Sequence, residues 1–248
     1  KVFSKTGKYI KNIDTPRFSN ASISKINNSI SMKVSSFLNP QEIYNLDKDL
    51  NEGKMIYKQN VNWDPNDYIV KQVWRKSKDG TDLPMWLIHH KNTKLDGRNP
   101  TWLTGYGGFY VSIKPSFNRN AIMWIERGGV FAVATLRGGS EYGERWHKSG
   151  MLLNKQNVFD DFISAGEWLI NNNYTSPDLL GIQGGSNGGL LVAAATTQRP
   201  ELFGAVLCGF PDLDILRFPW YVRNNNAPAL LEYGNSKNYD EFLAIKEY

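Results

Sequence analysis

The sequence has few of the residues on which disulfide, metal and histidine chemistry depend. Its 248 residues include one cysteine, Cys208, which excludes an internal disulfide and a cysteine-rich zinc site. This cysteine lies in an apolar stretch at 205–210, so we expect a buried and unreactive thiol. Only three histidines occur, His89, His90 and His147. Their scarcity limits which catalytic sites the chain can assemble.

Long apolar runs and dense runs of charge are also absent. No stretch of about 18 apolar residues occurs, so we expect no membrane partner. The net charge is +5, but lysine and arginine are scattered, which favours a solvated basic surface over a nucleic-acid partner. The sequence begins at Lys1 without a charged and then apolar leader, a start typical of a fragment. We expect a cytoplasmic protein, with a periplasmic or secreted location as the alternatives.

The first part of the chain, residues 1–62, has the pattern of an all-β segment. Short alternating runs separated by Asn, Asp, Gly and Pro predict strands at 1–4, 9–13, 29–36, 42–47 and 54–59. About four short strands are the content of one antiparallel blade of a β-propeller. A single blade cannot bury both of its faces, so this segment predicts neighbouring blades elsewhere.

The pattern of residues 63–248 indicates a different kind of domain. A turn-forming linker, Asp64-Pro65-Asn66-Asp67, leads to a predicted hairpin with strands at 68–75 and 83–90 and the turn Lys78-Asp79-Gly80-Thr81. Beyond residue 100, predicted strands at 101–104, 130–135, 179–183 and 205–210 alternate with predicted helices at 119–127, 157–172 and 188–198. Such alternation is typical of a parallel sheet covered by helices on both faces. We therefore predict an α/β domain at 63–248 and an irregular stretch at its end.

A G-x-S-x-G motif, Gly184-Gly185-Ser186-Asn187-Gly188, carries the chemistry of the sequence. An apolar strand precedes it and a helix of small residues follows it, which is the context of a nucleophile elbow. There a sharp bend exposes the serine hydroxyl above the sheet, and the N–H of the next residue points at a developing oxyanion. An incidental glycine-rich turn is the alternative.

Three further motifs surround this one. Tyr106 precedes Gly107-Gly108-Phe109 on the loop after the first parallel strand, so its hydroxyl is a candidate second oxyanion donor; a buried packing tyrosine is the alternative. The glycine-rich run 137–143 lacks the spacing of a phosphate loop and is interpreted as the rim of a pocket. Asp160 and Asp161 point about 100° apart on a helix, which favours a capping and surface role over paired acids.

A serine nucleophile needs a base, and this chain does not supply one in the usual order. In hydrolases with such an elbow the order is serine, then aspartate or glutamate, then histidine. Every histidine here precedes Ser186, and Asp212 and Asp214 follow it too closely. We therefore predict that no complete triad forms from this chain. Recruitment of His147 from an unusual direction remains the other option.

Together these motifs resemble the prolyl oligopeptidase family of serine peptidases. The resemblance rests on Tyr106–Phe109, the run 137–143, Trp146-His147-Lys148, Lys155-Gln156-Asn157, Asp160-Asp161-Phe162, the run 184–191 and the run 198–203. It implies an α/β-hydrolase domain joined to a β-propeller, of which residues 1–62 would be the last blade. It also implies cleavage of short peptides without a metal or organic cofactor. Ser186 would be the nucleophile, Asn187 N–H and the Tyr106 hydroxyl the oxyanion donors, and Phe109 a wall of the substrate pocket.

The sequence departs from that family in two respects. The family's catalytic aspartate and histidine lie in segments that this sequence does not contain, so we predict a truncated peptidase that is inactive alone and could take the missing C-terminal segment in trans. Proline-cleaving members carry a tryptophan shortly before the residues matching Tyr233-Gly234, whereas this chain has Asn224–Leu231 there. A preference for proline is therefore not predicted. A carboxylesterase or lipase on the same fold, and a non-catalytic remnant or binding module, are the alternative functions.

Overall fold

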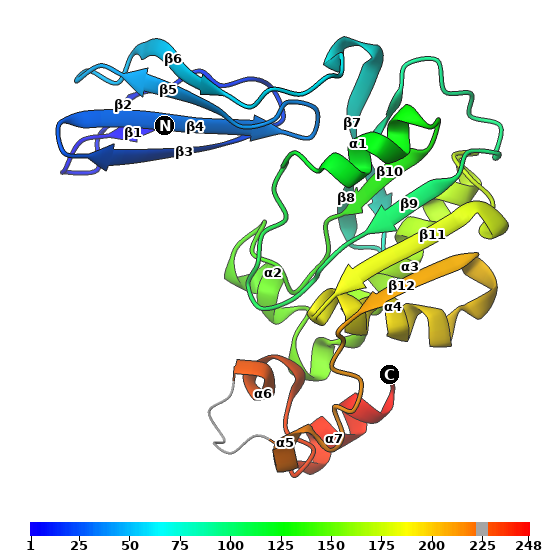
Figure 1. Cartoon of the computed structure of the whole chain (residues 1–248). Helices are drawn as coiled ribbons and strands as arrows, with labels where there is room; N and C mark the ends of the chain where they lie inside the picture. The colour runs from blue at the N-terminus through cyan, green and yellow to red at the C-terminus, as the bar shows by residue number, and fades with distance from the viewer. Residues whose placement is uncertain (222–227) are drawn as a thin grey trace. The chain divides into compact units, whose positions relative to one another are not determined.

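A computed structural model describes residues 1–221 and 228–248, and the backbone alone at positions 26 and 52. The chain divides into two compact units. One comprises Lys1–Val70 and Lys114–Ile122, and the other comprises Lys71–Ile113 and Met123–Tyr248. Figure 1 shows their elements, coloured from blue at the N-terminus to red at the C-terminus. Within the described ranges, no helix has both the length and the apolar character needed to cross a bilayer.

The first unit is built around a four-stranded antiparallel meander. Its strands pair in chain order and are β3 (Ser19–Ile26), β4 (Ser29–Ser36), β5 (Glu42–Leu46) and β6 (Glu52–Lys58). A separate two-stranded hairpin precedes it, formed by β1 (Val2–Phe3) and β2 (Tyr9–Lys11). Met32, Val34 and Leu46 form the core of the meander. The predicted all-β segment with the content of one blade is confirmed.

One strand of this meander, β3, was not predicted from the sequence. Its residues are rich in serine and asparagine, which are depleted in strands. The strand forms because it pairs with β4 along its whole length, from Ser19 opposite Ser36 to the turn. Asn27 takes φ 53° in that turn, a conformation that asparagine tolerates better than most residues. Pairing with a neighbour thus outweighs a weak intrinsic preference.

The second unit contains a six-stranded sheet. Its spatial order is β12-β11-β9-β10-β8-β7, and its strands are β7 (Tyr68–Lys76), β8 (Asp82–His90), β9 (Thr101–Thr104), β10 (Val130–Ala134), β11 (Leu180–Gly185) and β12 (Ala205–Gly209). Neighbours among β9 to β12 are parallel, whereas β8 runs antiparallel to β10. The predicted Asp-Gly hairpin joins β7 to β8, with Gly80 at φ 86°. The predicted α/β fold class is confirmed.

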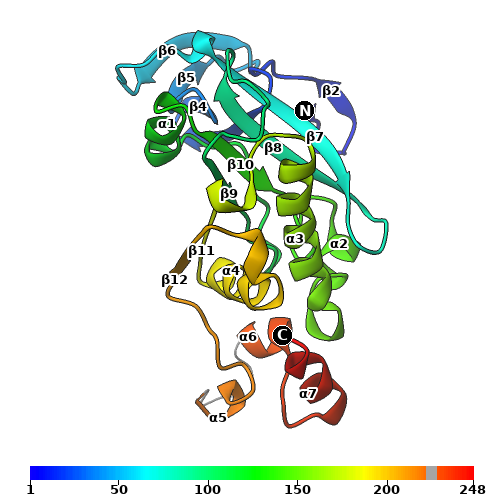
Figure 2. The ribbon, with the colours of Figure 1, turned by 90° about the vertical axis from the view of Figure 1, so that its right-hand side faces the viewer.

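Helices follow the strands of this sheet. They are α1 (Arg119–Glu126), α2 (Glu144–Lys148), α3 (Gln156–Asn171), α4 (Asn187–Gln198), α5 (Phe218–Tyr221), α6 (Pro228–Tyr233) and α7 (Tyr239–Lys246), with 3-10 turns at Pro65–Asp67, Leu152–Asn154, Pro177–Leu179 and Pro200–Leu202. Helices α3 and α4 pack against each other (Figure 2). They belong to the main core, where Phe162, Leu169 and Leu191 are fully buried. This burial fixes the start of α4 relative to the sheet.

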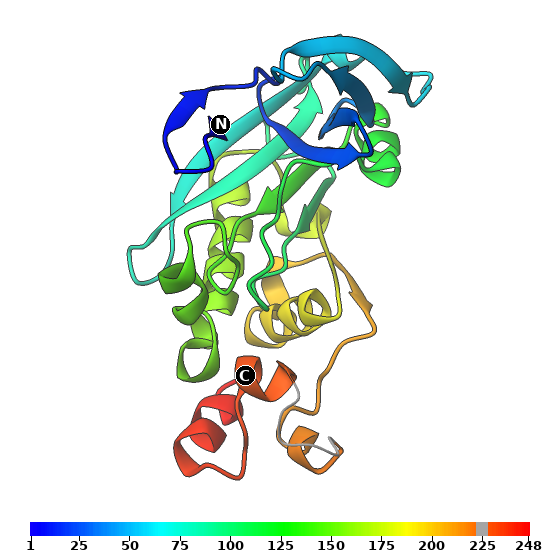
Figure 3. The same cartoon turned by 90° about the vertical axis from the view of Figure 1, so that its left-hand side faces the viewer.

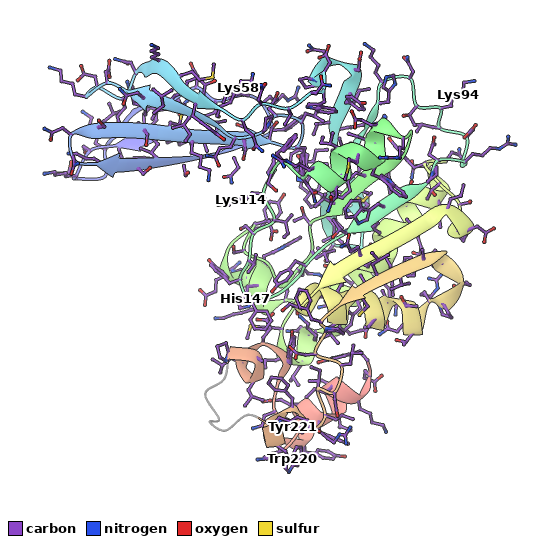
Figure 4. The ribbon with its side chains drawn as sticks, viewed as in Figure 1. Lys58, Lys94, Lys114, His147, Trp220 and Tyr221 are labelled. Atoms are coloured by element: carbon purple, nitrogen blue, oxygen red, sulfur yellow. The ribbon has the colours of Figure 1, made fainter. Side chains whose placement is uncertain are left out.

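The C-terminal stretch, expected to be irregular, contains the three short helices α5, α6 and α7. Figure 3 shows them together, coloured orange to red. Asn238 caps the N-terminus of helix α7, because its side chain accepts hydrogen bonds from the N–H groups of Asp240 and Glu241. Trp220 and Tyr221 of α5, labelled in Figure 4, are each 64% exposed. The sequence reading missed these helices because each spans only one or two turns.

The prediction that Cys208 and its strand are buried was wrong. Strand β12 pairs on one side with β11 and is the last strand of the sheet in the described part of the chain. Leu207 is 61% exposed and the Cys208 side chain is exposed as well. The apolar run predicted burial, but among the described residues no strand pairs with the other side of β12.

The prediction that Asp161 lies at the surface was also wrong. Its carboxylate is fully buried and accepts hydrogen bonds from the Arg137 guanidinium (2.6 Å to Nη2) and from Ser77 Oγ (2.6 Å). A second buried guanidinium, that of Arg75, reaches Ser164 Oγ at 2.8 Å on the next turn of α3. Burial lowers the pKa of Arg75 to about 10, against the opposing attraction of Asp161.

The run 137–143, interpreted as a pocket rim, begins inside this network. The Arg137 side chain is 5% exposed and also binds Asp79 Oδ2 at 2.5 Å. Hydrogen bonds from Thr81 and Arg137 lower the pKa of Asp79 to about 2, although partial burial opposes the shift. Arg137 thus joins the hairpin turn to helix α3, and its positive charge is neutralised by Asp79 and Asp161.

Candidate active site

Ser186 occupies a bend between strand β11 and helix α4. Its backbone angles are φ 56° and ψ −124°, and it is partly exposed. Its N–H donates to Gly209 O on β12 (3.0 Å), and its carbonyl accepts from Gly189 N (2.8 Å). A serine at the start of a helix usually caps it, but this hydroxyl makes no capping hydrogen bond. Strand, bend and helix follow one another as the motif predicts.

Two glycines make this bend sterically feasible. A Cβ atom at Gly184 would lie within van der Waals overlap of Gly188 O, at 1.9 Å. A Cβ atom at Gly189 would lie 2.7 Å from Gly209 O. The backbone of the bend is therefore packed against its own helix and against β12, and no larger residue fits at either position.

Asn187 is the first residue of α4 and is almost fully buried. Its side-chain Nδ2 donates to the carbonyl of Tyr106 at 2.5 Å, and its Oδ1 accepts from Lys155 Nζ at 3.1 Å. The side chain is therefore occupied by structural contacts. The backbone N–H is different, because the first N–H groups of a helix have no intrahelical partner. It is this N–H that we predicted as an oxyanion donor.

The loop that carries Tyr106 is held against the start of α4. Gly107, Phe109 and Tyr110 all have positive φ values, 64°, 54° and 60°. A Cβ atom at Gly108 would lie 2.7 Å from Asn187 Nδ2. Left-handed backbone at two residues other than glycine costs free energy and persists only where surrounding contacts impose it. The loop is thus a strained and closely packed segment, as catalytic loops often are.

Phe109, the predicted pocket wall, packs edge-on against Tyr233 of α6. The two ring centroids are 5.5 Å apart and the ring planes meet at 89°. Tyr233 is buried, and this burial raises the pKa of its hydroxyl above the usual value. The phenylalanine is therefore partly buried against the core through its contact with α6. Sequence reasoning had used Tyr233 only to align the chain with a family motif.

Two charged residues that sequence reasoning did not assign, Lys155 and Glu232, lie beside these loops. Lys155 is 1% exposed, and its Nζ donates to Gly107 O at 3.2 Å. Glu232 Oε1 lies 3.7 Å from the same nitrogen. Burial lowers the pKa of Lys155 to about 8, and the attraction of Glu232 limits that shift. Lys155 entered the sequence analysis only through the family resemblance, and no pattern in the sequence brings it together with Glu232, because their proximity arises only on folding.

All three histidines have hydrogen-bond partners, and His90 Nδ1 accepts from the Asn92 N–H at 3.1 Å. His147 lies on α2 (Figure 4), and its Nε2 is 2.8 Å from Glu232 Oε2. His89 is buried on β8, and its Nδ1 lies 2.9 Å from His90 O. Burial lowers the pKa of His89, which keeps that imidazole neutral. His147 is thus engaged by a carboxylate of α6.

Among residues 1–221 and 228–248, the acidic, histidine and cysteine side chains form no group of three or more that could hold a metal ion. The features described above are a serine on a strained bend, a helix N-terminus beside it and a tyrosine loop packed on that helix. A bend of this kind between a strand and a helix is typical of a nucleophile elbow.

Comparison with known proteins decides the family. The profile of the prolyl oligopeptidase family matches residues 115–248, more than half of the chain. The chain belongs to the prolyl oligopeptidase family. Relatives within it include the prolyl endopeptidase of Elizabethkingia miricola, which is 38% identical over 252 residues covering 100% of this chain and 36% of the relative. The prolyl endopeptidase of Dictyostelium discoideum is 39% identical, and the match covers 100% of this chain and 33% of the relative.

Solved prolyl oligopeptidase structures are similar over nearly the whole chain. One, from a study of two prolyl endopeptidases, has a TM-score of 0.94 and 42% identity, and covers 99% of this chain and 36% of that protein. A post-proline cleaving enzyme from Rickettsia typhi has a TM-score of 0.87 and 39% identity, and the match covers 93% of this chain and 33% of that protein. Prolyl oligopeptidase B from Galerina marginata, solved with a 25mer macrocyclization substrate, has a TM-score of 0.90 and 36% identity, with 98% and 34% covered.

The chain therefore spans about a third of the length of these prolyl oligopeptidase relatives. Its all-β segment and its α/β portion both match the solved structures. The departure from the family's tryptophan motif concerns residues 224–231, of which 224–227 lie outside the described residues. Leu230 is buried in α6 and Leu231 is 64% exposed.

Proposed function

We propose that this chain carries the nucleophile and oxyanion half of a serine peptidase that hydrolyses short peptides. The observation that carries the proposal is Ser186 at φ 56° on the bend between β11 and α4, with a hydroxyl that does not cap the helix. A serine held in this conformation presents its Oγ above the sheet, where a carbonyl can approach. The membership of the chain in a peptidase family favours peptides over simple esters as substrates.

The proposed reaction has two steps. Ser186 Oγ forms a bond to the carbonyl carbon of the peptide while a base takes the hydroxyl proton, and the carbonyl oxygen becomes an oxyanion. Asn187 N–H and the Tyr106 hydroxyl donate hydrogen bonds to that oxygen. The C–N bond then breaks, the amine leaves with the proton, and water hydrolyses the acyl-enzyme. Phe109 forms part of the wall against which the substrate side chain packs.

The acid and the histidine of this reaction come, in our proposal, from polypeptide outside these 248 residues. All three histidines precede Ser186, and His147 is already paired with Glu232. The relatives are about three times longer, which leaves room for both groups. The segment that carries them could act within one polypeptide or as a separate chain. Residues 1–248 alone would then turn over slowly, since loss of the base costs several powers of ten in rate.

Labelling and hydrolysis test the proposal together. The complete protein, meaning the whole polypeptide that its gene specifies, should react with a fluorophosphonate at Ser186, identified by mass spectrometry of the modified peptide. It should also cleave short blocked peptides faster than matched esters relative to the uncatalysed reactions. The heat-denatured protein, in which the bend is lost, is the control and should not be labelled.

Each alternative function predicts a different result. An esterase would cleave esters but not peptides. A binding module would give neither labelling nor turnover, even after addition of a separate polypeptide that carries the missing groups. Modification of a residue other than Ser186, with full peptide cleavage, would refute the assigned nucleophile.

Tyr106 provides a test of the second oxyanion donor. Replacing Tyr106 with phenylalanine removes one hydroxyl and leaves the ring, so kcat should fall about 100-fold, equivalent to about 2.7 kcal/mol of transition-state stabilisation, with little change in KM. Steady-state kinetics on a short peptide substrate measure this. Tyr110 on the same loop is the matched control, because it is 51% exposed and carries the same hydroxyl. Tyr110→Phe should stay within about twofold of the unaltered protein, and equal losses in the two variants would contradict the assignment.

A further inference from the structure

Lys155 is almost fully buried, which is unusual for a lysine side chain. It precedes helix α3, and its Nζ is enclosed by Gly107 O (3.2 Å), Asn187 Oδ1 (3.1 Å) and Glu232 Oε1 (3.7 Å). The ring centroid of Tyr233 lies 5.3 Å from the same nitrogen. An ammonium group has three hydrogens to donate, and three oxygen atoms from three segments surround it here.

The segments that Lys155 joins are those that carry the two proposed oxyanion donors. Gly107 follows Tyr106, whose hydroxyl is one donor, and Asn187 supplies the other through its N–H. A further hydrogen bond, from Asn187 Nδ2 to Tyr106 O, closes the connection between them. Lys155 therefore contacts the residue next to one donor and the side chain of the other. A shift of either segment would break one of these contacts.

Burial of the ammonium group has a cost that a merely structural contact would not require. A neutral residue could fill the same space, and an unpaired buried cation is strongly unfavourable. Glu232 supplies the compensating charge from α6, and its other oxygen lies 2.8 Å from His147 Nε2. Glu232 Oε1 accepts no hydrogen bond from the described residues, so its partner within reach is Lys155. The Lys155–Glu232 ion pair thus forms although both charged groups lose their contact with water.

We propose that Lys155 is a positioning residue that fixes the distance between the Tyr106 loop and the start of α4, and so preorganises the two oxyanion donors. It does not touch the substrate. Glu232 balances its buried charge and ties the same point to α6, which also carries the Phe109 partner Tyr233. This inference rests on the function proposed above, because it has meaning only if an oxyanion forms at Ser186.

The expected effect is specific to the oxyanion. Lys155→Met with Glu232→Gln removes both charges at similar volume, so the double variant avoids an unpaired buried carboxylate. Without the ammonium hydrogen bonds, the donors lose their spacing. In the complete protein we expect kcat to fall about 100-fold while KM stays within about threefold.

Binding of a transition-state analogue separates positioning from general damage. A peptidyl trifluoromethyl ketone adds to a serine Oγ and forms an oxyanion, whereas the matching peptidyl alcohol does not. We expect the double variant to bind the ketone about 100-fold more weakly and the alcohol within about threefold. Lys148→Met is the matched control, since Lys148 is exposed and paired with Glu144; it should change neither affinity.

Several results would overturn the inference. Unchanged ketone affinity in a folded double variant would do so, as would equal losses for ketone and alcohol. If the double variant does not fold, Asn187→Ala is the second test, because it removes one of the three oxygen atoms around Lys155 Nζ and should weaken ketone binding at least about tenfold. No change there would also refute the inference. Absence of any ketone adduct in the unaltered protein would instead reject the proposed function, and this inference with it.

Discussion

Replacing Ser186 with alanine should lower kcat of the complete protein by at least about 10⁴-fold, because no acyl-enzyme can form without the hydroxyl. Peptide hydrolysis followed by chromatography, on samples assayed at high protein concentration, measures the residual rate. Substrate binding should be retained, since the hydroxyl is a small part of the surface around it. A residual rate within tenfold of the unaltered protein would show that another residue attacks the substrate.

The same position links activity to stability. Serine at φ 56° and ψ −124° is strained, whereas glycine adopts such angles readily. Ser186→Gly should therefore abolish turnover and yet raise the free energy of unfolding by about 1 kcal/mol. Ser176→Gly is the matched control, because Ser176 has φ −124°; there the free energy of unfolding should fall by about 0.5 to 1 kcal/mol.

Replacing Asp161 with alanine should lower the free energy of unfolding by about 3 to 5 kcal/mol. The substitution leaves the Arg137 guanidinium buried without its main partner and removes the acceptor of Ser77 Oγ. It also removes the attraction that keeps the pKa of Arg75 from falling further below its usual value. Urea unfolding followed by circular dichroism or tryptophan fluorescence measures the difference.

The neighbouring Asp160 is a matched control for Asp161. Its carboxylate lies 3.9 Å from the exposed Lys78 Nζ and accepts a hydrogen bond from Gln156 on the same helix (2.9 Å). Asp160→Ala should therefore change the free energy of unfolding by no more than about 1 kcal/mol. Equal effects of the two substitutions would show that the buried network contributes little to stability.

The sequence was sufficient for the parts of the fold that depend on local pattern. The alternation of apolar strands with helices of 3.6-residue periodicity identified β9, β10, β11 and the helices between them. The glycines around Ser186 identified the bend, because only a few backbone arrangements bring a strand so directly into a helix. In both cases the pattern that identifies the feature is local in the sequence, although the bend is also held by Gly209 of β12.

Features that depend on distant residues could not be predicted in this way. Asp161 and Asp160 have the same chemistry and adjacent positions, yet only Asp161 faces two arginines from other segments, Arg75 of β7 and Arg137 of the turn after β10. Strand β3 is polar and forms because β4 pairs with it along its whole length. Lys155 received no role for the same reason, since its partners come from three separate segments of the chain.

The hydrogen bonds that tie the site together also determine when it can exist during synthesis. Asn187 reaches Tyr106 across 81 residues, Lys155 reaches Gly107 across 48, and His147 reaches Glu232 across 85. A nascent polypeptide released up to residue 200 would hold the serine without the carboxylate that neutralises the buried ammonium. Translation must therefore extend past α6 before all of these hydrogen bonds can form. A polypeptide that ended before α6 would contain Ser186 without the contacts of Glu232.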